Sequence, residues 1–254
     1  MSAVKIAVTN QKGGVGKTTT AVNMAFYMAK MGKKVLLIDF DPQGNATSGL
    51  GTEKTALKKS IVNVIDSSAS LGEVIYETKF KNLWLVPATQ ELANAEPGLA
   101  AQEDRFIRLA RAVMTIEKDY DYIIIDVPPS LGLLTVNALV ATKYVLLPVQ
   151  AEFYALEGLG QLLETMKLTR KLNPPLELLG VLVTMVDGRT ILAAQVYEEI
   201  KKHFPGKVFE TRIPRNVRLA EAPSHGLPVG AYDAISKGAR AYKAVTKEIV
   251  ERIG

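Results

Sequence analysis

A glycine-rich stretch near the N-terminus decides the fold: it reads Asn10-Gln11-Lys12-Gly13-Gly14-Val15-Gly16-Lys17-Thr18-Thr19. Residues 4–9 before it are largely apolar and β-branched, and residues 21–31 after it have the composition of a helix. A loop of this kind between a strand and a helix N-terminus is the context in which the pattern binds phosphate. The sequence therefore predicts a nucleotide-binding α/β protein.

Each residue type in this loop has a physical role in holding phosphate. Glycines let successive N–H groups converge on phosphate oxygens, and the helix dipole adds to the attraction. Lys17 supplies a compact positive charge, and the Thr18 hydroxyl is a suitable ligand for Mg²⁺. A plain glycine-rich turn would need neither the lysine nor the hydroxyl. The predicted nucleotide contacts here are Gly13, Gly14, Val15, Gly16, Lys17, Thr18 and Thr19.

The loop departs from the common phosphate-loop spacing, because Gln11 stands where the first glycine is expected and Lys12 follows it. Three further segments, at residues 36–45, 123–130 and 213–218, accompany it. Together they resemble the ParA/Soj family of chromosome-partition ATPases over essentially the whole chain. The loop and Asp41 are typical of the wider ParA/MinD superfamily, whereas residues 43–51 and 213–226 indicate the Soj-like branch.

Composition agrees with one sizeable α/β domain spanning residues 1–254. The chain is 48% apolar, and no stretch approaches the roughly 18 consecutive apolar residues of a membrane span. We expect a cytoplasmic protein, since the N-terminus lacks a signal-peptide pattern. The absence of cysteine excludes disulfides, thiolate-bound zinc and cysteine-held iron–sulfur clusters.

Alternating strand and helix patterns predict a single-domain P-loop NTPase with a mostly parallel, doubly wound sheet flanked by helices. The expected strands are residues 5–9, 34–39, 83–87, 122–126, 144–149 and 178–186. The expected helices include residues 18–31, with Gly32 as C-cap, 104–120, 156–172 and 191–204. Residues 123–125 and 181–183 are continuously apolar, so we expect their strands in the buried centre of the sheet.

Three acids follow predicted strands, at the edge where ligands of such sheets bind. Asp126 comes after an apolar run and has the character of a Walker B acid, which contacts Mg²⁺ directly or through water. Asp39 and Asp41 flank Phe40, and an extended backbone would point both to the same side. The resemblance implies that Asp41 orients the attacking water and that Asp39 supports the Mg²⁺ shell. Helix-capping or solvated loop acids are the alternative.

Two loops, residues 41–51 and 126–134, contain the glycines and prolines expected of conformational switches. The resemblance implies that they order around ATP and relax after hydrolysis. Plain strand-to-helix connections are the alternative, because turn residues alone do not imply motion.

The resemblance also implies how nucleotide and partner subunit meet. Lys12 would reach across to the partner's nucleotide in an ATP-dependent sandwich homodimer, and Glu152 would touch the partner's ribose. Met185, Pro214 and Asn216 would border the adenine. Lys12, Lys17 and Asp41 are thus the predicted catalytic residues, with Thr18, Asp39 and Asp126 around Mg²⁺.

The net charge of +5 is concentrated in the last quarter of the chain. Residues 1–188 hold 19 Lys/Arg and 19 Asp/Glu, whereas residues 189–254 hold 12 and 7. This imbalance predicts attraction to nucleic acid or an anionic membrane, and an ordinary solvated surface is the alternative. The resemblance implies non-specific contacts with double-stranded DNA. The candidate contacts are Arg189 and Arg218, widened by Lys201, Lys202, Lys237 and Arg240.

Partners and location follow from the resemblance as well. A ParB/Spo0J-like protein would stimulate ATP hydrolysis, a replication initiator is a second family-level partner, and the protein would associate with the nucleoid. The alternatives are a MinD-like membrane-cycling ATPase and a ParA-type positioner of another cargo. We interpret one apolar stripe at helical spacing as core rather than as a membrane-binding face. Its residues are Ile235, Ala239, Tyr242, Val245, Ile249 and Ile253.

Overall fold

The computed structural model describes residues 2–152 and 159–254. Its centre is a seven-stranded sheet in the order β3-β4-β2-β5-β1-β6-β7. The strands are β1 (Val4–Val8), β2 (Val35–Asp39), β3 (Tyr76–Glu77), β4 (Leu83–Val86), β5 (Tyr122–Asp126), β6 (Tyr144–Gln150) and β7 (Glu177–Thr184). Neighbours are parallel except β3 and β4. The six expected strands are confirmed, whereas β3 is too short to leave an alternating pattern.

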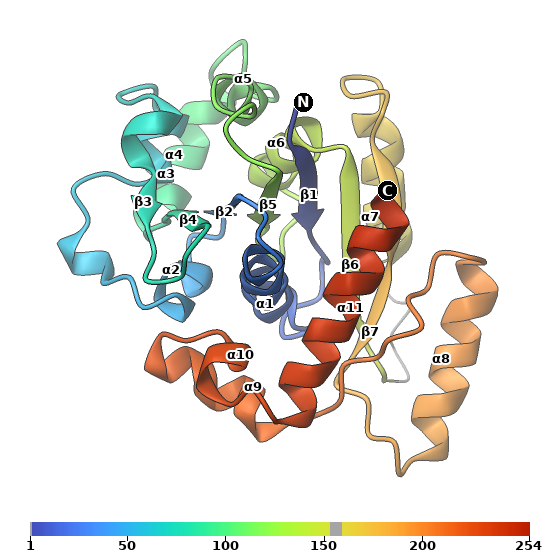
Figure 1. Cartoon of the computed structure of the whole chain (residues 1–254). Coiled ribbons are helices and arrows are strands. Elements are labelled where there is room, and N and C mark those ends of the chain that lie inside the picture. Colours follow the sequence, from blue (N-terminus) through green and yellow to red (C-terminus); the bar gives the residue numbers. More distant parts are fainter. Residues whose placement is uncertain (1, 153–158) are drawn as a thin grey trace.

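Helices cover both faces of this sheet (Figure 1). The longer ones are α1 (Lys17–Lys30), α4 (Glu91–Ala100), α5 (Arg108–Met114), α6 (Leu133–Ala141), α7 (Leu159–Thr169), α8 (Ile191–His203) and α11 (Lys237–Ile253). The short ones are α2 (Asn45–Gly49), α3 (Ile61–Ile65), α9 (Val217–Glu221) and α10 (Val229–Tyr232). Single 3₁₀ turns occupy Lys54–Ala56, Leu71–Val74 and Ala222–His225.

Helix α5 and the predicted apolar stripe differ from expectation. Helix α5 is shorter than the predicted 104–120, since the Thr115 hydroxyl donates to the carbonyl of Ala112 (2.7 Å) where the helix ends. Residue 156, the predicted start of α7, lies outside the described residues. Ile235 was wrongly assigned to the apolar stripe: the Ser236 side chain caps α11 by accepting from the N–H of Ala239, which leaves Ile235 before the helix and 82% exposed.

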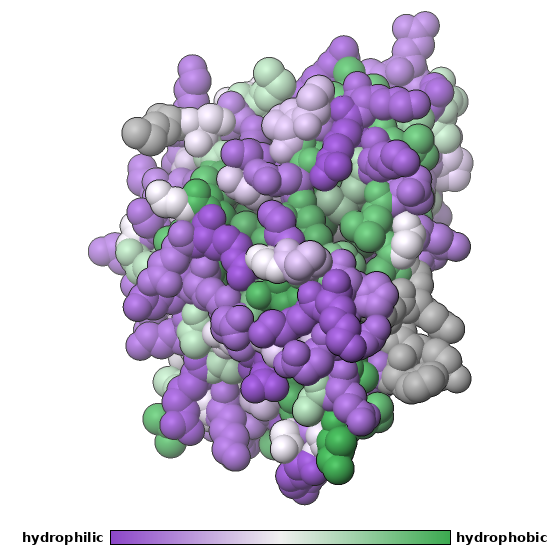
Figure 2. Space-filling view, turned by 90° about the vertical axis from the view of Figure 1, so that its right-hand side faces the viewer, coloured by the Kyte–Doolittle hydropathy of each residue, from purple (hydrophilic) through white to green (hydrophobic). Residues whose placement is uncertain are grey.

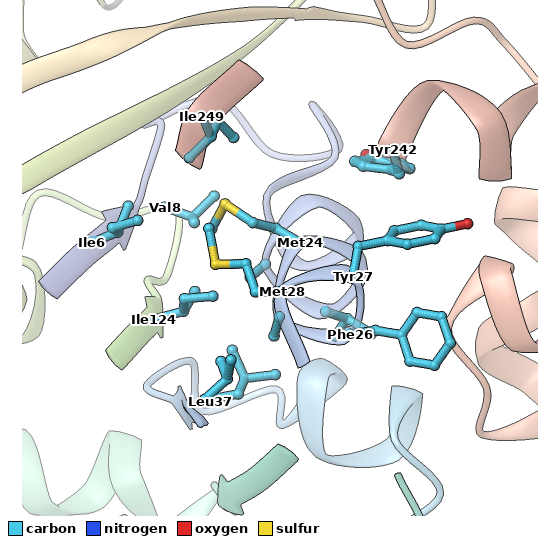
Figure 3. Close-up of a cluster of buried hydrophobic side chains, with 14 of the residues drawn as sticks. Ile6, Val8, Met24, Phe26, Tyr27, Met28, Leu37, Ile124, Tyr242 and Ile249 are labelled. Atoms are coloured by element: carbon cyan, nitrogen blue, oxygen red, sulfur yellow. The ribbon is translucent and has the colours of Figure 1, made fainter. Parts of the chain in front are cut away.

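The continuously apolar strands are explained by cores on both faces of the sheet. In β5, Ile124 belongs to the core under α1 and α11, whereas Ile123 and Ile125 point into the core under α3 to α6. Successive side chains alternate between faces, so a strand covered on both sides needs no polar positions. Figure 3 shows the first core, where Met24 and Met28 of α1 lie between Ile124 and Ile249.

The outer edge of β7 is covered by the segment that follows α8. The N–H of Val181 donates to the carbonyl of Lys207 (2.8 Å), and the N–H groups of Phe209 and Ile213 donate to carbonyls of β7. A paired edge strand cannot recruit another chain. The same run of chain ends at Pro214, which forms an isolated bridge with Val186 just beyond the carboxyl end of β7.

Two glycine turns touch backbone to backbone beside α2. Gly51 and Gly226 both have positive φ (81° and 61°), and a Cβ built on Gly226 would lie 2.5 Å from the Cα of Gly51. Only glycine allows both the left-handed conformation and this close approach. The segment around residues 44–51 is therefore held against the segment around residues 222–226.

We expect Gly226→Ala to lower the free energy of unfolding by roughly 2–4 kcal/mol, because backbone strain and a steric clash act together. Urea denaturation followed by circular dichroism measures this. Gly206→Ala is the matched control, since Gly206 also has positive φ (70°) but a Cβ there would meet nothing within 4 Å. Equal losses in the two variants would show that the contact with Gly51 contributes nothing.

Candidate nucleotide-binding site

The glycine-rich loop connects β1 to α1 and curls over the lysine at its end. Gly14 and Gly16 have φ values of 74° and 89°, and Gly16 forms the N-cap of α1. The ammonium of Lys17 donates to the carbonyl of Lys12 (3.2 Å), across the loop. The Thr184 hydroxyl donates to the carbonyl of Val15 (2.8 Å), which fastens the loop to the end of β7. These contacts within the chain hold the loop in shape.

Lys17 is a buried cation that faces acids. Its residue is 7% exposed, and this burial lowers the pKa of its ammonium, while Asp126 and Asp41 raise that pKa in part. A phosphate group arriving at the loop would complete the neutralisation of this charge. The predicted role of Lys17 fits its surroundings.

The register of the sheet sets two of the acids side by side. Asp39 at the end of β2 pairs with Asp126 at the end of β5, and both residues are fully buried. Asp39 accepts the N–H and the hydroxyl of Thr47, each at 2.7 Å, and the N–H of Asp41 at 3.3 Å. Neither carboxylate oxygen of Asp126 has a hydrogen-bond partner among the described residues.

Burial controls the protonation of this pair. It raises the pKa of Asp39 to about 6, and burial together with the charge of Asp39 raises the pKa of Asp126 well above its ordinary value. The nearby Thr18 hydroxyl and Lys17 ammonium oppose the shift at Asp126 without reversing it. Two such carboxylates are most stable when a cation lies between them and the loop.

The residues fit a magnesium ion that also uses phosphate oxygens. Buried carboxylate oxygens without partners, beside a threonine hydroxyl, are suitable ligands for Mg²⁺, which typically takes one or two carboxylates plus phosphates and water. Asp126 and Thr18 would hold it. In the part of the chain that the structure describes, no group of three or more His, Cys, Asp or Glu forms a metal cage. Asp39 has its oxygens engaged by the backbone and Thr47, so it positions the segment around α2.

Asp41 lies beyond the end of β2, in a turn. Its side chain accepts the N–H of Gln43 (2.9 Å), and its carbonyl accepts the N–H of Gly44 (2.8 Å). The turn begins after Asp41, at Pro42, whereas the N–H of Phe40 still donates to the carbonyl of Asp126 (2.9 Å) in continuation of the strand pairing. Asp41 is nevertheless only 7% exposed and acts electrostatically on Lys17, so it lies at the phosphate end of the site.

A pocket of about 460 Å³ extends from the loop along the end of β7. Gly14, Gly16 and Thr19 line one part of it, and the predicted adenine contacts Met185, Pro214 and Asn216 line another. These predicted residues, from three distant segments, share one cavity. The sequence interpretation assigned no nucleotide contact to the other lining residues, because nothing in their local sequence marks them as ligands; these include Gln150, Thr184, Leu219 and Tyr242.

Tyr242 is fully buried on α11, and its hydroxyl bonds to the Thr20 hydroxyl of α1 at 3.1 Å. It belonged to the predicted apolar stripe, and its position confirms that α11 packs on the core rather than facing outward. Ala239, Val245 and Ile249 are buried with it. No helix in the described ranges is long and apolar enough to cross a bilayer.

Lys12 and Glu152 lie together at the outer rim of the loop. The Lys12 ammonium is 3.3 Å from Glu152 Oε2, and the Gln150 amide donates to Glu152 Oε1. Both side chains of the pair are partly exposed, at 39% and 46%. The sequence suggested a partner-directed role for each residue and did not predict that they pair within one chain. Residues 153–158, the rest of that predicted segment, lie outside the described residues.

The predicted DNA contacts do not all gather in one place, and four of the six are paired with acids. Arg189 pairs with Asp187 (2.7 Å), and Arg218 pairs with Glu221 (2.7 Å) and Asp233 (3.3 Å). Lys201 and Lys202, paired with Glu210 and Glu199, lie at the far end of α8 from Arg189, about 20 Å along the helix. Lys237 and Arg240 are exposed at the start of α11.

The two buried carboxylates predict a pH dependence of stability. Folding raises the pKa values of both carboxyl groups, so the native protein binds more protons than the unfolded chain. The free energy of unfolding therefore falls as pH rises from about 4 through 6 and above. Without nucleotide and magnesium, Asp126→Asn should raise the unfolding free energy at neutral pH by roughly 1–2 kcal/mol and flatten this slope. Thermal melts across pH measure both effects. The exposed Asp119→Asn control should leave the slope intact, and an unchanged slope in Asp126→Asn would contradict the assignment.

Comparisons with known proteins agree with this site. A family model described as an AAA domain matches residues 3–178. The sporulation initiation inhibitor protein Soj of Bacillus subtilis (strain 168) is 55% identical over 245 residues, covering 96% of this chain and 97% of that protein. The chromosome partitioning protein ParA of Myxococcus xanthus (strain DK1622) is 48% identical over 248 residues, covering 97% and 88%.

A solved structure extends the likeness to the whole fold. Cobyrinic acid a,c-diamide synthase from Mycobacterium smegmatis, with a bound ATP analogue and magnesium, has a TM-score of 0.89 at 35% identity and covers 99% of this chain and 95% of that chain. The loop, the acids and the near-full-length identity to the Soj and ParA proteins lead to one conclusion: this chain belongs to the ParA/Soj family of chromosome-partitioning ATPases.

Proposed function

We propose that the protein is an ATP-driven switch for chromosome or plasmid segregation. An ATP-bound homodimer would hold double-stranded DNA without sequence preference, and hydrolysis stimulated by a ParB/Spo0J-like partner would release it. The observation that carries the proposal is the cavity that the phosphate loop shares with Met185, Pro214 and Asn216. It is supported by the buried carboxylate of Asp126, which accepts no hydrogen bond from any described residue.

Each residue of the site would have a distinct role in phosphoryl transfer. The loop N–H groups and Lys17 hold the β- and γ-phosphates, and Lys17 offsets charge as the bond to the leaving group breaks. Thr18 and Asp126 would hold a magnesium ion, which would supply neutralisation of the phosphate charge. Asp41, at the phosphate end of the site, positions the attacking water. Asp39 keeps the segment around α2 in place through Thr47.

Lys12 provides the link between nucleotide and dimer. In the single chain its ammonium is paired with Glu152 at a partly exposed rim, so the pair is weakly held and can exchange partners. In the proposed dimer Lys12 leaves Glu152 for the nucleotide of the partner subunit. Glu152 then becomes available to the partner's ribose hydroxyls. The exchange would make ATP part of the interface and hydrolysis the signal for separation.

The surface around α8 is consistent with a nucleic acid ligand. Hydrophilic residues cover most of this side of the molecule (Figure 2). Arg189, just before α8, and Arg218, on α9, are both exposed. Their partners Asp187 and Glu221 are also close to the surface. Phosphate groups could replace these carboxylates at little cost, since exposed ion pairs contribute little stability. The packing of α11 argues against the MinD-like alternative.

We expect Asp41→Ala to reduce ATP turnover by roughly a hundredfold or more, with ATP affinity changed only a few-fold. The reason is that positioning of water is lost while the loop and Lys17 remain. Phosphate release and equilibrium binding of a fluorescent ATP analogue measure the two quantities. Asp66→Ala, at an acid far from the site in sequence, is the control. A parallel loss of affinity and turnover would assign Asp41 to nucleotide binding instead.

We expect the Asp41→Ala protein to sediment with random-sequence duplex DNA in ATP but not in ADP, with affinity that falls as salt rises. Arg189→Ala and Arg218→Ala in this background should each weaken sedimentation, whereas Lys171→Ala should not. Lys12→Ala should lose DNA binding while still binding ATP, because the dimer fails to form. Sedimentation with anionic liposomes instead of DNA would overturn the proposal in favour of membrane cycling.

A further inference from the structure

A second basic surface lies away from the C-terminal quarter of the chain. The segments 30–34 and 79–82 contain Lys30, Lys33, Lys34, Lys79 and Lys81 and no acidic residue. All five lysines are exposed, and none has a carboxylate within 4 Å of its ammonium among the described residues. We call these two segments the lysine groove. Counting charge along the sequence conceals it, because residues 1–188 are neutral as a whole.

Strand pairing brings the two segments together. Segment 30–34 leads from α1 into β2, and segment 79–82 is the turn from β3 into β4. The N–H of Val35 donates to the carbonyl of Asn82 (2.9 Å), where β2 and β4 begin to pair. The lysine groove therefore lies at the amino ends of β2 and β4, whereas Asp39 and the nucleotide pocket lie at the carboxyl ends. It is a separate surface from the proposed nucleotide site.

The turn between β3 and β4 is rigidly placed. The Thr78 hydroxyl donates to the carbonyl of Leu83 (2.7 Å) and accepts the N–H of Phe80 (3.1 Å). The ring of Phe80 packs edge-on against Phe26 of α1, with centroids 5.2 Å apart. These contacts hold the backbone that carries Lys79 and Lys81 against the end of α1.

Between the segments is a hollow of about 340 Å³ with aromatic walls and a cationic rim. Phe26 and Phe80 line it, together with Lys30, Lys79 and Lys81. The ammonium of Lys30 lies 5.5 Å from the centroid of Phe26, and that of Lys79 lies 5.6 Å from the centroid of Phe80. Both ammonium groups therefore lie near aromatic rings that line the hollow, and such contacts leave them available to anions.

We propose that the lysine groove binds an acidic segment of a partner protein, one that carries an aromatic or large apolar side chain between its carboxylates. The unpaired lysines would attract the carboxylates, and the apolar side chain would enter the hollow against Phe80. Duplex DNA fits this surface less well, since its phosphate ridges carry no apolar group to fill the hollow. Asp121 accepts the backbone N–H of Lys34 (2.7 Å), and among the described residues no carboxylate forms an ion pair with a groove ammonium.

The test uses the full chain and a labelled peptide of repeated Glu-Glu-Phe triplets, with fluorescence anisotropy as the readout. We expect saturable binding whose affinity falls as salt rises. The double variant Lys30→Glu with Lys81→Glu should lose roughly tenfold in affinity, because it turns two attractive charge pairs into repulsive ones. The matched double variant Lys118→Glu with Lys171→Glu has the same net charge and should bind as the unchanged protein does. ATP turnover should stay the same in both.

Two further probes make the proposal falsifiable. A Glu-Glu-Ser peptide of equal charge should bind several-fold more weakly, because it cannot fill the hollow. Equal affinity for the two peptides, or no loss in Lys30→Glu with Lys81→Glu, would overturn the proposal. Duplex DNA is the third probe: if the groove variant loses DNA affinity and the peptides do not bind, the surface serves nucleic acid. Amide shifts of Gly32 and Phe80 on peptide addition would locate the contact.

Discussion

The pairing of β2 with β5 is the constraint on which the site depends. It sets Asp39 against Asp126 at the buried carboxyl edge of the sheet, with Lys17 as the nearby cation. Burial and mutual repulsion make the ionised forms of these two carboxyl groups unfavourable, and both pKa values are raised as a result. The two acids stay together despite this repulsion, because β-strand pairing and the two cores hold the backbone in register. The arrangement is complementary to a phosphate chain with a divalent cation, so binding relieves what folding leaves unsatisfied.

Asp39 also connects the phosphate end of the site to distant loops. Its carboxylate holds Thr47, whose hydroxyl in turn accepts the N–H of Ala88 (3.0 Å). The segment that carries Thr47 ends at Gly51, which touches Gly226. Residues 222–226 directly follow α9, where Arg218 pairs with Glu221. A continuous set of contacts therefore runs from the buried acids to the proposed DNA surface. These packed and hydrogen-bonded contacts join the two regions within one chain.

The distribution of charge on the folded surface differs from its distribution along the sequence. In the folded chain Arg189 pairs with Asp187, and Arg218 pairs with Glu221 and Asp233. The lysine groove, in contrast, arises in a region whose total charge is zero. Its two segments meet because β2 and β4 are neighbours, and none of its ammonium groups forms an ion pair among the described residues.

The sequence by itself determined the parallel fold, the phosphate loop and the acids at strand ends, because these depend on local patterns: glycine spacing, apolar runs and the residue that ends each run. It also identified Met185, Pro214 and Asn216 through family resemblance, and the fold brings them to one pocket. Tertiary structure alone decided that Tyr242 lines that pocket, that Lys12 meets Glu152, that Asp39 holds Thr47, and that five lysines form a groove. These contacts join residues far apart in the chain, and no local pattern encodes which strands and helices become neighbours.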